Sequence, residues 1–327
     1  MRAAIIGAGW IAAEHAAILR RLEGVELAAV CDIDERRARE LAGPAHVYTD
    51  WRELLERETP DAVFVCTPPK VHREAAVEAL ERGIHVYLEK PVARDLDDAQ
   101  AIVQAAESSA AVCAVGYQWR AIEVLDALRD ALDGQALGLL IGIGTGPTKS
   151  RPWFLNRAEG GGNLLERASH SIDLERAVAG EVVAVQAVAA SNPLAQSEGT
   201  LGDIDDAASI VLRFENGAVG STSIAWTRDG LPGRYSLDVL GSDSALHLEL
   251  DPHFTLSGVS GGRKVEATMA QHPIERSVER FFSAAREGDA TSVFCTPRDA
   301  AGTLAAVVAC ETALESGQTV AVQPLSF

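Results

Sequence analysis

The chain has 327 residues, about twice the length of a typical single domain, so we expect two domains with sizeable cores. Its 29 Lys and Arg residues are outnumbered by 47 Asp and Glu residues. The resulting net charge of -18 argues against nucleic acid or an anionic membrane surface as a partner. Five cysteines without metal-ligand spacing indicate no metal site and fit a reducing compartment.

The apolar N-terminus resembles a signal peptide only in its first residues. Gly7 and Gly9 interrupt the apolar run, and Glu14 and His15 follow it directly. No other uncharged apolar stretch reaches the ~20 residues needed to cross a bilayer. We therefore expect a soluble, cytoplasmic protein without a membrane partner. Only four of the 29 basic residues are Lys, so a Lys at a strand end carries more information than usual.

Short apolar runs alternate with helical periodicity in the first part of the chain. Strands are expected at residues 3–6, 27–31, 62–66, 84–88 and 112–115, and helices to residue 22, from residue 34, at 71–82 and at 95–108. Strands that alternate with helices predict a parallel sheet with crossover connections, and hence a doubly wound α/β domain. We assign residues 1–119 to this domain.

The pattern changes after Arg120. An apolar run at 137–143 and a helix at 163–179 precede successive strands at 182–190, 208–214, 218–226, 235–240 and 245–250. Between two of these strands, Glu215-Asn216-Gly217 is a tight-turn signature of an antiparallel hairpin. Helices at 274–286 and 298–316 close the chain. We therefore expect residues 120–327 to form an α+β domain with an open, mostly antiparallel sheet.

A glycine-rich segment follows the first expected strand and opens the first helix. It consists of Gly7, Ala8, Gly9, Trp10, Ile11 and Ala12. In a dinucleotide fingerprint the first Gly permits the turn, the second lets the pyrophosphate approach the backbone, and the third position needs a small side chain. Asp32 ends the second strand, where a carboxylate accepts hydrogen bonds from the adenosine ribose. The alternative is an ordinary turn followed by a solvated Asp.

Asp32 also bears on the choice of cofactor. A carboxylate about 4 Å from a 2′-phosphate costs on the order of 4 kcal/mol at an effective dielectric constant of about 20. The sequence therefore favours NAD over NADP. Arg36 and Arg37 follow closely and can offset part of that repulsion.

Two further loops follow strands at the same carboxyl edge, where α/β sheets bind ligands. One begins Cys66, Thr67, Pro68, Pro69, with His72 near the next helix start; the other is Glu89, Lys90, Pro91. The prolines stiffen a loop expected to border the cofactor, and Lys90 can donate to a substrate oxygen. The alternatives are that the first loop is a plain strand-to-helix turn and that Lys90 is an ordinary surface residue. Nothing near Cys66 in sequence suggests a base that activates its thiol.

In the second part, three glycines run into a helix that carries Glu166, His170 and Asp173. Spacings of four and three residues place these side chains on one helix face. A carboxylate one turn before an imidazole orients it and raises its basicity, as a general base requires. Asp173 is assigned to structure, and a core histidine is the alternative for His170.

These motifs together resemble the glucose-fructose oxidoreductase, inositol dehydrogenase and MocA family, usually written Gfo/Idh/MocA. The likeness comprises the glycine loop with Asp32, the CTPP and EKP loops, GYQWR at 116–120, and three glycines followed by Glu166, His170 and Asp173. It extends over nearly the whole chain.

The resemblance implies an N-terminal Rossmann domain that binds NAD and a C-terminal α/β domain whose open sheet often forms the subunit contact. It implies that the glycine loop, Asp32, the CTPP loop with His72, and Glu89 and Lys90 surround the cofactor. It places Lys90 beside nicotinamide and substrate, with His170 as acid or base on the substrate hydroxyl. Glu166 stands where many members have Asp.

The resemblance also implies substrate contacts and assembly. Tyr117 and Arg120 match a segment that borders the site in the family. Trp153, before the three glycines, is a candidate wall of the substrate pocket or a core residue. One layer of helices leaves one face of an open sheet uncovered, and the resemblance implies a homodimer or homotetramer.

Three functions remain open at this point. The leading hypothesis is an enzyme that moves hydride between NAD and a secondary hydroxyl of a sugar, polyol or related small molecule. A glycosidase that uses transient oxidation and elimination is the second hypothesis. The third is a non-catalytic regulator that binds NAD, against which the joint presence of Lys90 and His170 argues.

Overall fold

The computed structural model describes residues 1–147, 156–157, 161–191, 196–197, 200–201, 204–227, 230–251 and 253–323. These form two compact units. The first contains Met1–Gln118 and Pro273–Ala301, and the second contains Trp119–His272 and the described residues from Gly302 onward. We expected the second domain to run from residue 120 to the end, but the chain returns to the first unit at Pro273.

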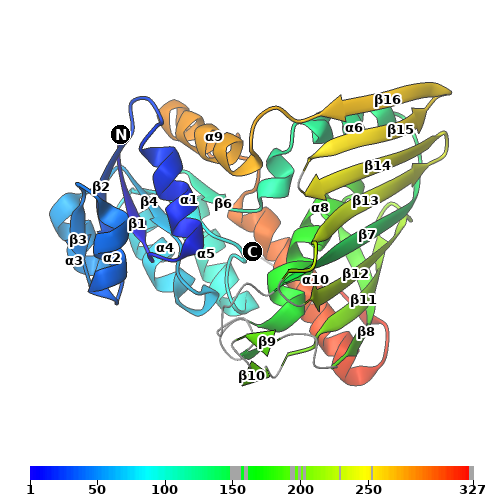
Figure 1. Cartoon of the computed structure of the whole chain (residues 1–327), viewed down its shortest axis with the longest axis horizontal. Helices are drawn as coiled ribbons and strands as arrows, with labels where there is room; N and C mark the ends of the chain where they lie inside the picture. The colour runs from blue at the N-terminus through cyan, green and yellow to red at the C-terminus, as the bar shows by residue number, and fades with distance from the viewer. Residues whose placement is uncertain are drawn as a thin grey trace. The chain divides into compact units, whose positions relative to one another are not determined.

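Helix α9 (Pro273–Glu287), labelled in Figure 1, explains this return. Its residues Phe281 and Phe282 are completely buried in the core of the first unit and pack against Phe64 at ring-centroid distances of 5.8 and 6.0 Å. Ser277 adds a hydrogen bond of 2.9 Å to the Tyr87 hydroxyl. An amphipathic pattern alone does not reveal which sheet a helix covers.

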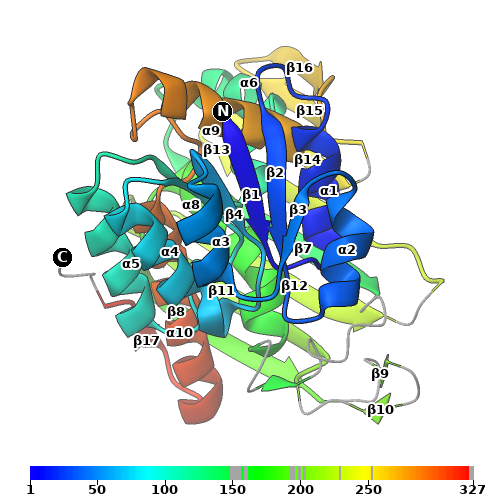
Figure 2. The ribbon, with the colours of Figure 1, turned by 90° about the vertical axis from the view of Figure 1, so that its left-hand side faces the viewer.

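The first unit is built on a six-stranded parallel sheet in the order β3-β2-β1-β4-β5-β6. The strands are β1 (Arg2–Ile6), β2 (Glu26–Cys31), β3 (His46–Tyr48), β4 (Ala62–Val65), β5 (His85–Leu88) and β6 (Cys113–Val115). Figure 2 shows β1, β2 and β4 within this sheet. The order is that of dinucleotide-binding folds, which confirms the predicted doubly wound domain.

The helices of the first unit are α1 (Trp10–Leu19), α2 (Glu35–Ala42), α3 (Trp51–Glu58), η1 (Pro69–Val71), α4 (His72–Glu81) and α5 (Leu96–Ser108), besides α9. Strand β3 and helix α3 were not predicted. Strand β3 has only three residues and none of them is buried, so no apolar run indicates it. The central strands are buried on both faces, so they read as short uninterrupted apolar runs.

The second unit contains a nine-stranded sheet in the order β16-β15-β14-β13-β7-β12-β11-β8-β17. Its strands are β7 (Leu137–Pro147), β8 (Val182–Ala190), β11 (Ala207–Phe214), β12 (Val219–Thr227), β13 (Arg234–Gly241), β14 (Ser244–Asp251), β15 (Thr255–Ser260), β16 (Arg263–Thr268) and β17 (Val320–Ala321). Every pairing is antiparallel except β7 with β12. The predicted open, mostly antiparallel sheet is thus confirmed, and β15 and β16 extend it further. A separate pair, β9 (Gln196–Ser197) and β10 (Thr200–Leu201), is also antiparallel.

Among the described residues, the helices of the second unit are η2 (Gln118–Ala121), whose first residue still belongs to the first unit, α6 (Val124–Leu132), η4 (Leu164–Ala168) and α8 (Ser169–Ala179). Helix α10 (Pro297–Ser316) runs from the first unit into the second. The expected helix at 163–179 is divided: η4 is a π-helical turn, and the regular α-helix begins at Ser169. In β11 buried and exposed residues alternate, so one sheet face is covered and the other carries exposed side chains such as Val211.

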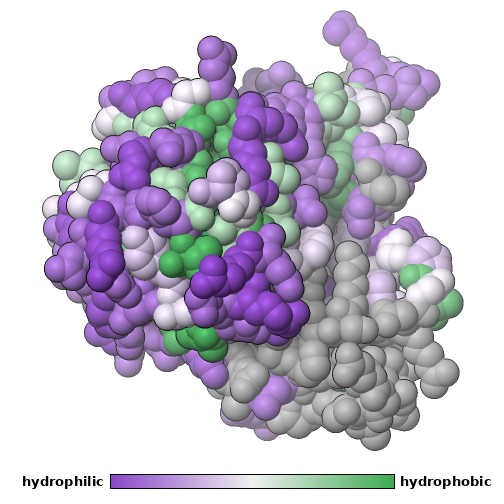
Figure 3. All heavy atoms as spheres, turned by 60° about the vertical axis from the view of Figure 1, so that its left-hand side comes forward, coloured by the Kyte–Doolittle hydropathy of each residue, from purple (hydrophilic) through white to green (hydrophobic). Residues whose placement is uncertain are grey.

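Hydrophilic residues cover most of the described surface in Figure 3, which brings the first unit forward. Apolar residues occur there in small patches. Within the ranges given above, we find no helix with the length and apolar character that crossing a membrane requires.

Candidate active site

The loop after β1 lies directly against the loop after β4. Gly7 has a φ of +94°, and a Cβ on it would lie 2.8 Å from the carbonyl of Cys66 and 3.0 Å from the nitrogen of Thr67. Only glycine fits this close approach of two backbones. A Cβ on Gly9 would meet no atom within 4 Å, so the space beside the start of α1 is open. An anionic phosphate is favoured at such a helix start, and these residues fit a dinucleotide.

Asp32 ties this loop to the end of β2. Its Oδ2 accepts a hydrogen bond of 2.7 Å from the Ala8 N–H, and its Oδ1 accepts one of 2.9 Å from the Asp34 N–H. A carboxylate offers about four acceptor positions, so Asp32 retains capacity for ribose hydroxyls. Behind it, Arg36 lies 3.1 Å from Glu40 and Arg37 lies 3.5 Å from Asp34. Both arginines therefore have acidic neighbours that compete with an added phosphate.

The loop after β4 contains the expected Thr67, Pro68 and Pro69, with Pro69 buried at the start of η1. Burial raises the pKa of the Cys66 thiol well above its ordinary value, so it is not a thiolate nucleophile.

His72 does not face solvent. The imidazole is completely buried, with Nε2 at 2.8 Å from the Thr67 carbonyl oxygen and Nδ1 at 3.0 Å from the Pro91 carbonyl oxygen. Burial lowers the pKa of His72. We expected His72 to contact the cofactor, whereas the structure places its ring beneath the two loops that it joins.

Glu89 and Lys90 follow β5 at the same edge of the sheet. Glu89 is turned inward, and its Oε1 lies 2.7 Å from Nε2 of His15 on α1. Lys90 is half-exposed, and its peptide bond to Pro91 is cis. His15 was not among the predicted site residues. One feature of the sequence could have indicated its burial. His15 lies on the same helix face as Ala12 and Ala16, and a polar side chain on an apolar helix face is buried with its neighbours.

The second unit carries the other proposed catalytic groups. Glu166 lies on the π-helical turn η4 and His170 on α8, and both are half-exposed. The indole ring of Trp119 lies 5.2 Å from the His170 ring and 5.4 Å from the Tyr235 ring, measured between centroids. His170 is therefore bordered by the Trp119 ring and remains partly accessible to solvent.

Asp173 is buried, whereas Glu166 and His170 are half-exposed. Its carboxylate accepts two hydrogen bonds from Arg120, of 2.8 and 2.9 Å, and one of 2.8 Å from the Thr303 hydroxyl. Arg120, expected at the substrate, is held in this bidentate ion pair. In the first unit, the expected substrate residue Tyr117 is buried. Trp153 lies outside the described residues.

Arg167 is a buried cation that was not among the predicted site residues. Its guanidinium carbon lies 4.0 Å from the centroid of the Trp226 ring, and it donates hydrogen bonds to the Tyr235 hydroxyl and, at 3.0 Å, to the Gly146 carbonyl. Burial lowers the pKa of Arg167. These contacts join η4 to β7, β12 and β13, and so support the element next to His170.

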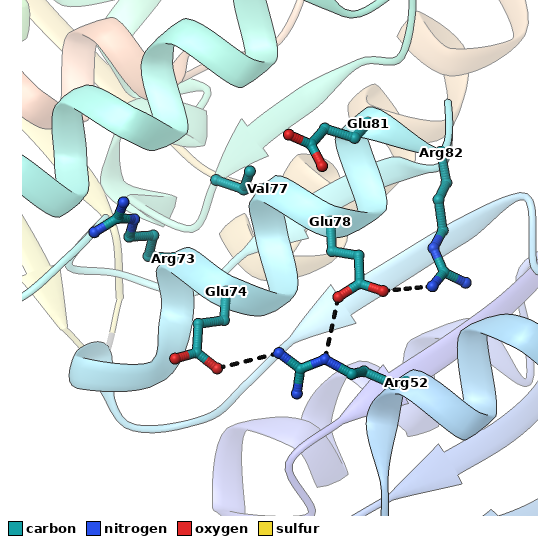
Figure 4. A pocket seen from close by; sticks show the side chains of 7 residues that line it. All are labelled: Arg52, Arg73, Glu74, Val77, Glu78, Glu81 and Arg82. Atoms are coloured by element: carbon teal, nitrogen blue, oxygen red, sulfur yellow. Dashed lines mark hydrogen bonds and ion pairs between the residues drawn. The ribbon is translucent and has the colours of Figure 1, made fainter.

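A hollow between α3 and α4 has a different character (Figure 4). Arg52 lies 3.5 Å from Glu74 and 3.3 Å from Glu78, and Arg82 also pairs with Glu78. These charges compensate one another on a solvated face. Across the described part of the chain, no three His, Cys, Asp or Glu side chains form a group that could hold a metal ion.

Comparison with known proteins identifies two matching regions. Residues 1–117 match the GFO/IDH/MocA oxidoreductase family with its NAD-binding Rossmann fold, and residues 128–247 match a GFO/IDH/MocA C-terminal domain. Together these matches span more than half of the 327 residues.

Individual proteins are also similar. The chain is 29% identical over 248 residues to a 4-carboxy-2-hydroxymuconate-6-semialdehyde dehydrogenase of Sphingobium sp., covering 72% of this chain and 75% of that protein. It is 29% identical to a myo-inositol 2-dehydrogenase of Thermotoga maritima over 67% of each. A solved levoglucosan dehydrogenase in complex with NADH superposes with a TM-score of 0.85 and 21% identity, covering 99% of this chain and 100% of that one. This last likeness shows the fold.

Proposed function

The chain belongs to the GFO/IDH/MocA family of oxidoreductases, and on that premise we propose that it is an NAD-dependent dehydrogenase or reductase. Its substrate in this proposal carries a secondary hydroxyl or carbonyl group and is a sugar, a polyol or a related small molecule. The observation that carries the proposal is the common edge of one parallel sheet, which bears the glycine loop, Asp32 and Lys90. The names of the myo-inositol and levoglucosan relatives support the substrate class.

The first unit would hold the cofactor. The open space at Gly9 suits the pyrophosphate, and the remaining acceptor positions of Asp32 suit the adenosine ribose. Asp32 and the acidic partners of Arg36 and Arg37 favour NAD over NADP, because a 2′-phosphate would add negative charge beside carboxylates. When bound, the nicotinamide supplies the hydride acceptor or donor.

Proton transfer is assigned to the chain's own side chains. In the oxidative direction His170 removes the proton from the substrate hydroxyl, and Glu166 orients the imidazole from the preceding turn. The ammonium of Lys90 donates a hydrogen bond to the same substrate oxygen and stabilises the negative charge that develops on it. In the reductive direction His170 returns the proton to that oxygen.

A screen of sugars, polyols and related diols for NAD reduction tests the proposal. On the best substrate, Lys90→Ala and His170→Ala should each lower kcat by about a hundredfold or more, while NAD affinity changes little. Lys264→Ala is the matched control, since Lys264 is an exposed Lys paired with Glu266. Full activity in either of the first two variants would contradict the assignment. Substrate cleavage without net formation of NADH would indicate the glycosidase. NAD binding without turnover of any substrate would indicate the regulator.

Assembly and location complete the proposal. One face of the large sheet exposes Val188, Val211 and Val219, an apolar surface that a second copy of the chain would cover in a homodimer or homotetramer. All five cysteines are buried thiols outside any disulfide, which supports a reducing compartment such as the cytoplasm.

A further inference from the structure

Lys90 stands between two residues that are each held by a buried histidine. His15 contacts the side chain of Glu89, and His72 contacts the main chain of Pro91. The two histidines come from different helices, α1 and α4, and neither ring is accessible to solvent. Both lie within the first unit.

The contact with Glu89 replaces solvent around a buried carboxylate. Glu89 is only 7% exposed, and a charge at that depth is stable only with compensating hydrogen bonds. Its Oε1 lies 2.7 Å from Nε2 of His15, and its Oε2 accepts a hydrogen bond of 3.2 Å from the Lys90 N–H. A Cβ at Gly116 would lie 2.9 Å from Oε1, so the carboxylate is confined from that side too.

The His15 ring is itself fixed by aromatic packing. Its centroid lies 5.2 Å from that of Phe64 and 5.1 Å from that of Tyr87. Because α1 begins at the glycine loop, the contact between His15 and Glu89 links that helix to the residue before Lys90. A shift of α1 would therefore also shift Glu89, the residue before Lys90.

His72 acts on the opposite side of Lys90. Its Nδ1 lies 3.0 Å from the Pro91 carbonyl oxygen, and its Nε2 lies 2.8 Å from the Thr67 carbonyl oxygen. Both nitrogens face main-chain acceptors; a neutral imidazole donates from one nitrogen only, so the ring lies between the EKP loop and the CTPP loop, donates to one of the two carbonyls and packs against the other. The two histidines together leave little freedom for the backbone at Lys90.

We propose that His15 and His72 are positioning residues that fix the backbone on both sides of Lys90 and hold its ammonium where it meets the reacting oxygen. This inference rests on the role given to Lys90 in the proposed function. Displacement of a catalytic group by about 1 Å can lower a rate by about a hundredfold. Neither histidine touches substrate or cofactor in this proposal, so its loss should act on turnover more than on binding.

The test compares His15→Leu and His72→Leu with Tyr87→Phe. Each of the first two should lower kcat by about tenfold to a hundredfold with NAD affinity within about twofold of wild type. Tyr87→Phe removes the hydrogen bond to Ser277 in the same aromatic cluster, so it controls for loss of core stability and should keep kcat. Glu89→Gln and His15→Gln, which retain hydrogen-bonding groups, serve where a Leu variant does not fold. Glu89→Gln should also lower kcat. The kcat of His15→Gln should lie between that of His15→Leu and that of wild type.

The decisive measurement combines each histidine variant with Lys90→Ala. If the histidines act through Lys90, adding His15→Leu or His72→Leu to Lys90→Ala should lower kcat no further. Additive losses, a normal kcat in both histidine variants, or an equal loss in Tyr87→Phe would overturn the inference and leave the role of Lys90 intact. Full activity of Lys90→Ala alone would instead overturn the proposed function, and this inference with it.

Discussion

Glu175 should make the second unit less stable as the pH rises. This residue of α8 is completely buried against the large sheet, where Gly142 and Gly220 leave room for its carboxyl group. Oε1 accepts a hydrogen bond from the Thr222 hydroxyl, and Oε2 has no hydrogen-bond partner among the described residues. Burial raises the pKa of Glu175 from 4.5 to about 7. The protonated acid is therefore the form that this interior favours.

The size of the effect follows from the two pKa values. Below pH 4.5 the group is protonated in both the folded and the unfolded chain, so it contributes no pH dependence. Between 4.5 and about 7 the folded state binds the extra proton, so its stability falls as the pH rises. A shift from 4.5 to about 7, at 1.36 kcal/mol per unit, lowers the free energy of unfolding by about 3 kcal/mol above pH 7.

Glu175→Gln isolates this contribution, because the amide keeps the shape and an acceptor for Thr222 but cannot ionise. The difference in free energy of unfolding between the variant and wild type should rise in the variant's favour by about 3 kcal/mol from about pH 4 to about pH 8. In a thermal unfolding series this is about 6–12 °C in Tm for a unit of roughly 150–250 residues. Glu315→Gln, at an exposed position on α10, should leave the pH dependence of Tm unchanged. Parallel Tm curves for wild type and Glu175→Gln would refute the reasoning.

Three further predictions concern the cofactor, the base and assembly. Asp32→Ala should raise NADP affinity relative to NAD by between about tenfold and a thousandfold, since repulsion of on the order of 4 kcal/mol disappears. Fluorescence titration with both cofactors measures this, and an unchanged ratio would contradict the role of Asp32. In Glu166→Gln the rising limb of the oxidative rate should move to lower pH, because the imidazole loses the carboxylate that favours its protonated form; the same pH profile as wild type would mean that Glu166 only packs. Light scattering at micromolar concentration should give two or four times the chain mass of 34.6 kDa, and a particle of 34.6 kDa would exclude the oligomer.

Local signals were sufficient for much of the architecture. The apolar run before Gly7 and the small residues after it predicted β1, the loop and α1, because turn chemistry and helical periodicity act over a few residues. Asn216 marked the hairpin between β11 and β12, and its Oδ1 accepts the Ala218 N–H in the structure. The carboxyl edge that carries Asp32 and Lys90 followed from the alternation of strands and helices.

Tertiary structure alone decided which polar groups are buried together. His15 and Glu89 are 74 residues apart, Arg120 and Asp173 are 53 apart, and Glu175 meets Thr222 across 47 residues. No periodicity connects such partners, since the local pattern around each states only that its face is buried. Whether a buried charge is compensated depends on the side chain that the fold brings opposite it. The return of α9 to the first unit has the same origin, because an apolar helix face specifies burial but not the sheet that covers it.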